Sequence, residues 1–257
     1  MQNLTISLIQ CELAWEQAQD NREQMTAEIA TIEGDTDLIV LPEMFTTGFS
    51  MNALANAEEP GGPTEQWMLQ TAGEKDCAVT GSIAARDGDA VYNRMLFATP
   101  QGMYHYDKRH LFRMLGEHKR YAAGEERVVV EWRGWRILLQ VCYDLRFPVF
   151  SRNREDYDLA LYVANWPSSR RQHWRQLLQA RAIENLACVV GVNRIGADAN
   201  GLTYSGDSMA IAADGEVLLD AMNEKGAARV TLDGASLLAY RESFPCQLDA
   251  DSFQLEP

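Results

Sequence analysis

Short, nearly unbroken apolar runs recur along this sequence, and each one stops at a polar residue. The clearest are DLIVLPE at residues 37–43, WRILLQVCYD at 135–144 and LALYVANWP at 159–167. A strand with solvent on one face alternates apolar and polar residues, whereas a strand covered on both faces is apolar throughout. These runs therefore predict central strands of a covered sheet, with their ends opening onto polar loops.

Helical patterns separate the strand-like segments. Helices are expected at about residues 20–34, 64–71, 169–187 and from Asp233 onward. Further strands are expected at 4–10, 77–84, 91–100, 188–196 and 208–221, with turns at Asp87–Gly88 and Asp214–Gly215. The alternating order, without repeats or linkers, predicts one α/β domain over residues 1–257, with a loosely attached tail from about residue 245.

The charge balance limits the partners of the chain. There are 23 basic and 37 acidic residues, giving a formal net charge of -14. This field repels a polyanion, so we expect a small-molecule partner and no nucleic acid. The apolar runs are far shorter than the roughly 20 residues of a membrane-spanning helix, and the first residues lack the pattern of a signal peptide. No membrane partner is expected.

The five cysteines are spaced widely and irregularly, at positions 11, 77, 142, 188 and 246. There is no CxxC pair and no Cys/His cluster with the spacing of a zinc site. The sequence therefore predicts free thiols, a cytoplasmic location and no bound metal.

A polar, reactive residue follows three of the predicted strands, and a fourth candidate follows an aromatic segment. Glu43, Cys142 and Asn165 each follow one of the apolar runs, and Lys108 follows the aromatic segment MYHYD. Ligands usually bind where the strands of an α/β sheet end, because backbone groups there are unpaired and loops converge. We therefore expect the functional site at these strand ends.

Cys142 is the candidate nucleophile. Free cysteines are most often core residues, and that interpretation suffices for Cys11, Cys77 and Cys188. The residues after Cys142, YDLRFP, are polar or turn-forming, which predicts a sharp bend at the cysteine. Such a bend can turn the thiol outward while the following N–H groups face the same space, so a nucleophile and an oxyanion site arise together.

A thiol nucleophile needs a base, and the four histidines show no pattern that points to Cys142. Glu43 is the alternative, because a carboxylate just past a buried strand is partly desolvated and suited to proton transfer. Its other interpretation is a helix-capping or surface residue. Lys108 would stabilise a thiolate or an oxyanion, although Lys108 and Glu117 both lie in polar contexts where surface charges are the default.

Three segments together resemble the signatures of the nitrilase superfamily of carbon–nitrogen hydrolases: LPEMF, YDKRHLF and VCYDLRFP, in that order. The resemblance implies a four-layer α-β-β-α sandwich, pairing into a homodimer, and no metal or cofactor. It implies Glu43 as general base and later acid, Lys108 as stabiliser of the tetrahedral intermediate and Cys142 as nucleophile. The backbone N–H of Tyr143 would share the oxyanion role, and Glu117 would hold Lys108.

Within that family, the stretches HLFRM, CYDLRFP and ANWP resemble the ω-amidases. These cleave the terminal amide of 2-oxo dicarboxylic acid monoamides, such as 2-oxoglutaramate and 2-oxosuccinamate. Several arginines near the signatures could hold the free carboxylate of such a substrate, each with a surface ion pair as its other interpretation: Arg113, Arg146, Arg170 and Arg171. Phe45 and Trp166 are candidates for the pocket wall, or else core residues.

Other functions stay open at this point. A different amide hydrolase of the same superfamily would act on a deaminated-glutathione amide or an N-carbamoyl compound. A non-catalytic binding module would keep the fold without the chemistry, and the intact Glu, Lys and Cys positions argue against it. A nucleotide-binding protein has no support, because no GxGxxG or GxxxxGK[ST] segment follows a strand.

Overall fold

The structure is a computed structural model that describes residues 1–254, and within them twelve strands form two six-stranded sheets. The first sheet has the order β14-β1-β2-β3-β4-β5. Its strands are β1 Leu4–Gln10, β2 Leu38–Val40, β3 Ala78–Asp87, β4 Ala90–Thr99, β5 Gly102–Asp107 and β14 Gly226–Leu232. The second sheet has the order β13-β12-β9-β8-β7-β6. Its strands are β6 Val129–Trp132, β7 Trp135–Val141, β8 Leu159–Ala164, β9 Cys188–Asn193, β12 Met209–Ile211 and β13 Val217–Asp220.

The main hydrophobic core lies between the two sheets. It joins inward-facing residues of both, including Ile6 and Val40 from the first sheet and Ile137, Leu161 and Val190 from the second. Because adjacent residues of a strand point to opposite faces, the remaining apolar residues of the same strands need a cover on the outer faces. The apolar runs thus call for helices on both outer faces of the pair.

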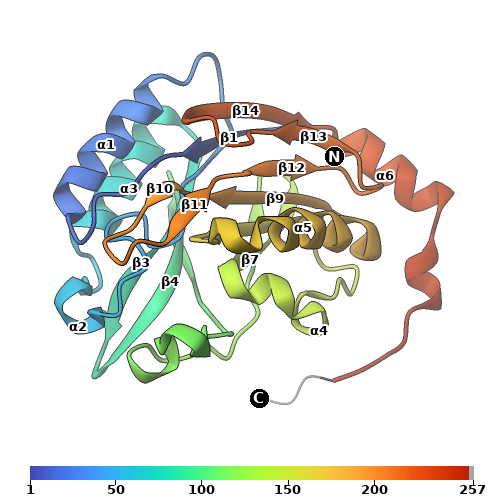
Figure 1. The fold of residues 1–257 in the computed structure, drawn as a ribbon. Helices are drawn as coiled ribbons and strands as arrows, with labels where there is room; N and C mark the ends of the chain where they lie inside the picture. Colours follow the sequence, from blue (N-terminus) through green and yellow to red (C-terminus); the bar gives the residue numbers. More distant parts are fainter. Residues whose placement is uncertain (255–257) are drawn as a thin grey trace.

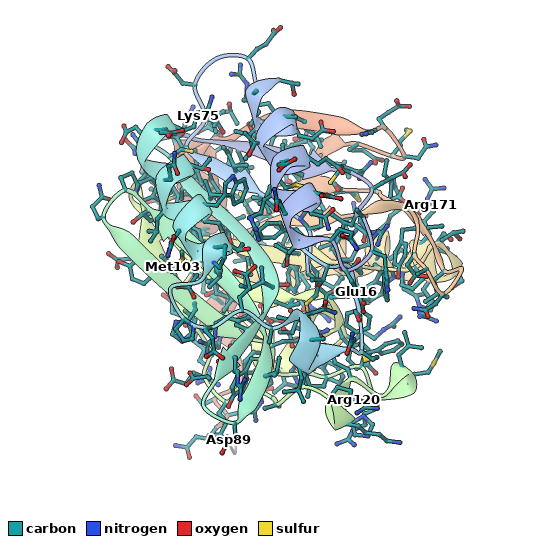
Figure 2. The ribbon with its side chains drawn as sticks, turned by 90° about the vertical axis from the view of Figure 1, so that its left-hand side faces the viewer. Glu16, Lys75, Asp89, Met103, Arg120 and Arg171 are labelled. Carbon is teal, nitrogen blue, oxygen red and sulfur yellow. The ribbon has the colours of Figure 1, made fainter. Side chains whose placement is uncertain are left out.

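Helices supply that cover. On the first sheet lie α1 (Ala18–Ala30) and α3 (Pro63–Lys75), which bury Met25 and Met68 against strand residues such as Ile39. On the second sheet lies α5 (Arg171–Asn185), which buries Trp174 and Leu178. Figure 1 shows α1 and α3 on the left and α5 right of centre, and Figure 2 shows α1 and α3 side by side on the near face. The predicted four-layer α-β-β-α sandwich is confirmed.

The direction of the strands gathers the loops that carry the polar residues. In the first sheet β1, β2 and β3 run parallel, and β5 runs the same way as β3 because two antiparallel pairings separate them. In the second sheet β7, β8 and β9 run parallel. The loops after β2 and β5 therefore leave one edge of the first sheet, and those after β7 and β8 leave one edge of the second.

Most predicted elements are present, with differences at their ends. Pro63, and not Thr64, begins α3, since Pro at the first position of a helix has no N–H to leave unpaired. The predicted helix at 169–187 opens with a 3₁₀ turn, η4 (Ser168–Arg170), before α5. Asp233 caps α6 (Gly234–Ser243) by accepting hydrogen bonds from two N–H groups of the first turn. The edge strands β5, β6 and β14 were not predicted, because polar or exposed residues interrupt their apolar positions.

Several short elements connect the layers. They are α2 Ala53–Asn56, α4 Pro148–Ser151, η1 Arg113–Leu115, η2 Glu117–Lys119, η3 Cys142–Arg146, η5 Cys246–Asp249 and the hairpin of β10 Ile195–Ala197 and β11 Thr203–Ser205. After α6 the chain runs down the outside of the molecule through η5 (Figure 1). The last three residues of the predicted tail, 255–257, lie outside the described residues. Within residues 1–254, no helix has the length and apolar character needed to cross a bilayer.

The core between the sheets gives a stability prediction. Leu161 is fully buried there, so Leu161→Ala leaves a cavity and should lower the free energy of unfolding by about 2–5 kcal/mol. Leu54 is 72% exposed, and Leu54→Ala should change it by less than about 0.5 kcal/mol. Urea unfolding of both variants measures the difference; equal effects would mean that the core between the sheets does not hold the fold together.

Candidate active site

Glu43 follows Leu41 and Pro42 in the loop after β2, and its side chain is fully buried. Its Oε1 accepts hydrogen bonds from Lys108 Nζ at 2.9 Å and from Asn93 Nδ2 at 2.8 Å. Its Oε2 accepts the backbone N–H of Asn165 at 2.7 Å. The next residue, Met44, has a φ of 46°, so the chain bends sharply just after the carboxylate. Glu43 is therefore an interior residue held by donors from three other strands or strand ends.

Cys142 stands on a bend of its own. It directly follows β7, opens η3 and has a φ of 47°, in the left-handed region that costs a non-glycine residue roughly 1–2 kcal/mol. The bend turns the thiol toward the pocket, and Cys142 is partly exposed whereas Glu43 and Lys108 are buried. In a helix that starts here, the first N–H groups, that of Tyr143 among them, have no acceptor within the helix.

Lys108 is the buried cation of the site. It follows β5, and its backbone N–H donates to the carbonyl of Asn93 on β4 at 3.0 Å. Its Nζ donates to Glu43 Oε1 at 2.9 Å and to Glu117 Oε1 and Oε2 at 3.0 and 3.1 Å. The ammonium also lies 5.0 Å from the centre of the Phe49 ring. All three donors of the ammonium are therefore directed at two carboxylates.

Glu117 is buried as well, which excludes the surface position that its sequence context suggests by default. It begins η2, and its Oε2 also accepts the backbone N–H of Phe112. Burial raises the pKa of Glu117, the Lys108 charge opposes this rise, and the charge of Glu43 adds to it. The structure thus brings Glu43, Lys108, Glu117 and Cys142 into one cluster.

The thiol is neutral in this cluster. Burial raises the pKa of Cys142 well above its usual range, and the charge of Glu43 and a hydrogen bond from the thiol to Glu43 raise it further, against the effect of Lys108. Burial acts to lower the pKa of Lys108, but Glu117 and Glu43 outweigh burial and hold it above its usual value. Ionisation of the sulfur therefore needs a carboxylate to accept the proton, as the sequence predicts for Glu43.

Asp144 holds the bend in place, a role that the sequence did not reveal. It is fully buried and accepts four hydrogen bonds: from the N–H of Val141 at 2.9 Å, from the Tyr106 hydroxyl at 2.7 Å, and from the N–H and the ring Nδ1 of His110 at 3.0 and 2.7 Å. Tyr106 and His110 flank Lys108 along the chain. One carboxylate therefore ties the loop that carries Lys108 to the bend that carries Cys142.

A pocket opens onto the cluster. Glu43, Lys108 and Cys142 line it together with a largely apolar wall: Phe49, Phe112, Leu115, Trp166, Leu202 and Tyr204. A mostly apolar pocket with a few convergent polar groups is typical of a small-molecule site. Trp166 lies on the wall, as proposed from the sequence. Phe45 does not: it packs beside Trp67 on the helix-covered face of the first sheet, because the bend at Met44 turns its ring away from the pocket.

Two of the four candidate arginines reach the pocket. Arg146 lies 4.7 Å from the Trp166 ring centre and Arg170 lies 5.5 Å from that of Phe112. Neither forms an ion pair with a carboxylate of residues 1–254, and burial together with the charge of Arg170 lowers the pKa of Arg146. Arg171 pairs with Asp207 at 2.7 Å instead, and Arg113 is exposed outside the pocket.

Comparison with known proteins shows the relationships of the chain. The family model described as carbon-nitrogen hydrolase matches residues 5–242. This chain belongs to the carbon–nitrogen hydrolase family. It is 51% identical to omega-amidase YafV of Yersinia enterocolitica, over 99% of this chain and 100% of that protein. It is 33% identical to 2-oxoglutaramate amidase of Bacillus subtilis, over 94% and 95% of the two chains.

A solved structure of the same family shares its fold. The crystal structure of XC1258 from Xanthomonas campestris, a CN-hydrolase superfamily protein with an arsenic adduct in its active site, matches with a TM-score of 0.97 and 48% identity over 100% of both chains. The family predicted from the signature segments and the predicted hydrolase class are confirmed. Among the residues that the structure of this hydrolase describes, no group of three or more His, Cys, Asp or Glu is placed to hold a metal ion.

The sequence did not point to Asn93, which contacts both carboxylates of this hydrolase. Asn93 is buried within β4, and its Nδ2 donates to Glu43 at 2.8 Å and to Glu117 at 3.3 Å. One signal was available, because asparagine is depleted in strands and here interrupts the apolar segment VYNRMLF. A polar residue inside a buried strand needs a partner, and the partners here come from distant segments.

The raised pKa of Cys142 predicts that a variant of Glu43 makes the thiol more reactive toward an alkylating agent, and not less. Glu43→Gln removes one cause of the rise and leaves Lys108, which lowers the pKa of the thiol. The pH midpoint of Cys142 alkylation by iodoacetamide should therefore move to lower pH, since the thiolate is the reactive form. Mass spectrometry of the modified peptide reads the rate, with Cys142→Ala as control. An unchanged or higher midpoint would show that the charge of Glu43 does not act on the sulfur.

Proposed function

We propose that this chain is an ω-amidase, which hydrolyses the terminal amide of small 2-oxo dicarboxylic acid monoamides, such as 2-oxoglutaramate and 2-oxosuccinamate, to the acid and ammonia. One observation carries the proposal: Arg146 and Arg170 line the same pocket as Cys142 and have no carboxylate partner in the described part of the chain. Two cations without a carboxylate partner, of which Arg146 contacts the His173 ring at 3.0 Å, are suited to an anionic substrate in a protein of net charge -14. The relatives named omega-amidase and 2-oxoglutaramate amidase support the same substrate class.

In the first half of the proposed reaction, Glu43 accepts the proton of the Cys142 thiol as the sulfur adds to the amide carbon. The carbonyl oxygen becomes an oxyanion, which Lys108 and the backbone N–H of Tyr143 stabilise. Lys108 acts on the oxyanion through its charge, because its three N–H groups already donate to Glu43 and Glu117, which hold the buried ammonium in place.

Glu43 then donates the same proton to the amide nitrogen, the carbon–nitrogen bond breaks, and ammonia leaves. A thioester to Cys142 remains. Glu43, again a carboxylate, accepts a proton from water as the hydroxyl adds to the thioester carbon. When the second tetrahedral intermediate collapses, the sulfur leaves and takes back the proton, which releases the acid. One carboxylate serves both halves because its protonation state alternates.

The substrate suits both ends of this pocket. The neutral terminal amide meets the thiol, and the free carboxylate pairs with Arg146 or Arg170. The aromatic and leucine wall packs against the methylene groups between them. A small apolar nitrile would leave both arginines unpaired. A non-catalytic module would have no need for a thiol, a carboxylate and an ammonium in one pocket.

Further expectations from the sequence stay predictions. These are a single domain over residues 1–257, a homodimer, a cytoplasmic location and the lack of a metal or cofactor. The continuous core between the two sheets supports the first.

An ammonia-release panel tests the proposed function. The wild type should hydrolyse 2-oxoglutaramate with the highest kcat/KM, ahead of a deaminated-glutathione amide and an N-carbamoyl amino acid. Cys142→Ala should keep the wild-type fold, as measured by circular dichroism, and lose turnover, because among the described residues that line the pocket there is no other cysteine and no serine or threonine. Preference for either competing substrate would replace the ω-amidase assignment, and near wild-type turnover by Cys142→Ala would remove the cysteine from the mechanism.

The arginines give a separate test of the substrate anion. Arg146→Ala should lower kcat/KM for 2-oxoglutaramate by about 10- to 100-fold, the equivalent of one charge-assisted contact of about 1.5–3 kcal/mol. A neutral amide of the same length should be affected much less. Arg171→Ala is the matched control, since Arg171 pairs with Asp207 outside the pocket. Equal losses on the charged and neutral amides would mean that Arg146 does not bind the carboxylate.

A further inference from the structure

The hydrogen bonds around Glu43 and Glu117 leave their four carboxylate oxygens unequal. Oε1 of Glu43 and Oε1 of Glu117 each accept from the same two donors, Lys108 Nζ and Asn93 Nδ2. Oε2 of Glu117 accepts from Lys108 Nζ and from the N–H of Phe112. Oε2 of Glu43 accepts from the N–H of Asn165.

A carboxylate oxygen offers about two acceptor positions. Nitrogen donors within residues 1–254 therefore fill both positions on three of the four oxygens, and on Oε2 of Glu43, the carboxylate to which the Cys142 thiol donates, they leave one position open. A carboxylate oxygen can accept a proton only where one of its acceptor positions is not already occupied by another donor. Glu117 offers none, although it is a carboxylate at the same ammonium.

We propose that Asn93 is a positioning residue that, together with Lys108, makes Oε2 of Glu43 the oxygen that exchanges protons with Cys142, the leaving nitrogen and water. The proposal rests on the proposed function for the reaction itself. Asn93 does not line the pocket, so it acts through Glu43 and Glu117 and does not touch the substrate.

The strand pairing explains how Asn93 comes to this place. The N–H of Lys108 donates to the carbonyl of Asn93, so the register of β4 and β5 sets the two residues opposite each other. Both side chains then reach the same pair of carboxylates. The titratable groups that face Lys108 and Asn93 are these two carboxylates, the Cys142 thiol and the hydroxyl of Tyr121, whose pKa burial and then Glu117 raise.

The chemistry of an amide fits this position better than the alternatives. A second lysine would neutralise the cluster and weaken the base, and an aspartate would add a third carboxylate. The Asn93 amide brings two N–H donors and no charge. Its Oδ1 has no hydrogen-bond partner in the described part of the chain, a state that costs a buried group about 1–3 kcal/mol. This orientation is unfavourable for stability alone, and it is required if the N–H groups must face the carboxylates.

Asn93→Ala tests the proposal through the pH dependence. The variant loses a hydrogen-bond donor to both carboxylates, which favours their protonated forms over the ionised ones. The acidic limb of the kcat/KM profile should therefore move to higher pH. We expect kcat to fall about 100-fold, as for a misplaced general base, with KM changed by less than about threefold. Asn93→Asp keeps the shape and adds a carboxyl group, so it should move the acidic limb further in the same direction.

Alkylation of Cys142 tests the same point without any substrate. The Glu43 charge, with one donor fewer, should act more strongly on the thiolate, so the alkylation midpoint of Asn93→Ala should move to higher pH, opposite to Glu43→Gln. If the wild type hydrolyses no 2-oxo monoamide, the proposed function fails. The alkylation midpoint still tests the role of Asn93 in that case, because it requires no substrate.

Asn185→Ala is the matched control. Asn185 is a buried asparagine on α5 whose side chain bonds the carbonyl of Arg181 at 2.9 Å and the N–H of Asn153 at 2.8 Å, away from the pocket. It should lower the thermal midpoint and leave both pH profiles unchanged. The proposal is overturned if Asn93→Ala keeps the wild-type profiles, if it alters KM or stability alone, or if neither Asn93 variant folds, since Asn93 would then serve the fold and not the base.

Discussion

The site depends on one buried ammonium between two buried carboxylates. Burying the Lys108 ammonium without a partner would cost several kcal/mol of folding free energy. Glu43 and Glu117 both accept hydrogen bonds from this ammonium, and without its charge the two neighbouring carboxylates could not both stay ionised. Each group therefore requires the others. The arrangement has one positive charge fewer than it has carboxylates. Burial first, and this imbalance in addition, keep the neighbouring sulfur protonated until a carboxylate accepts its proton. The reactivity of the thiol is a property of the cluster and not of the cysteine alone.

The backbone makes this cluster possible by bending where the strands end. Met44 and Cys142 both take a left-handed conformation. Met44 directly follows Glu43 in the loop after β2 of the first sheet, and Cys142 directly follows β7 of the second sheet. Such strain persists only where the surroundings hold it, and the four hydrogen bonds to Asp144 do so at Cys142. Asn165 connects the two sheets, since its N–H and its side-chain amide donate to the carboxylate and the carbonyl of Glu43. The geometry of the site is thus fixed by the packing of one sheet on the other.

The sequence predicted the parts of the site that follow from local patterns. Glu43, Cys142 and Asn165 stand directly after apolar runs, and a run buried on both faces must end where its loop becomes polar. Asn93 was missed because its role depends on Glu43, fifty positions away, and on the register of β4 with β5. Phe45 was a candidate for the pocket wall or the core, and it lies in the core because the left-handed residue Met44 changes the side on which the next side chain lies. The edge strands β5, β6 and β14 were missed because polar or exposed residues interrupt their apolar positions.

The distribution of charge in the pocket also bears on product release. The arginines are half-buried on the wall, whereas Glu43 and Glu117 are fully buried beneath it. The proposed substrate presents a carboxylate to the arginines and a neutral amide to the thiol, so binding places no anion beside Glu43. Hydrolysis converts that amide into a second carboxylate, next to two carboxylates that share one lysine. Like charges at such separations repel strongly where water is scarce. The same imbalance that keeps the thiol neutral before the reaction therefore favours departure of the acid after it.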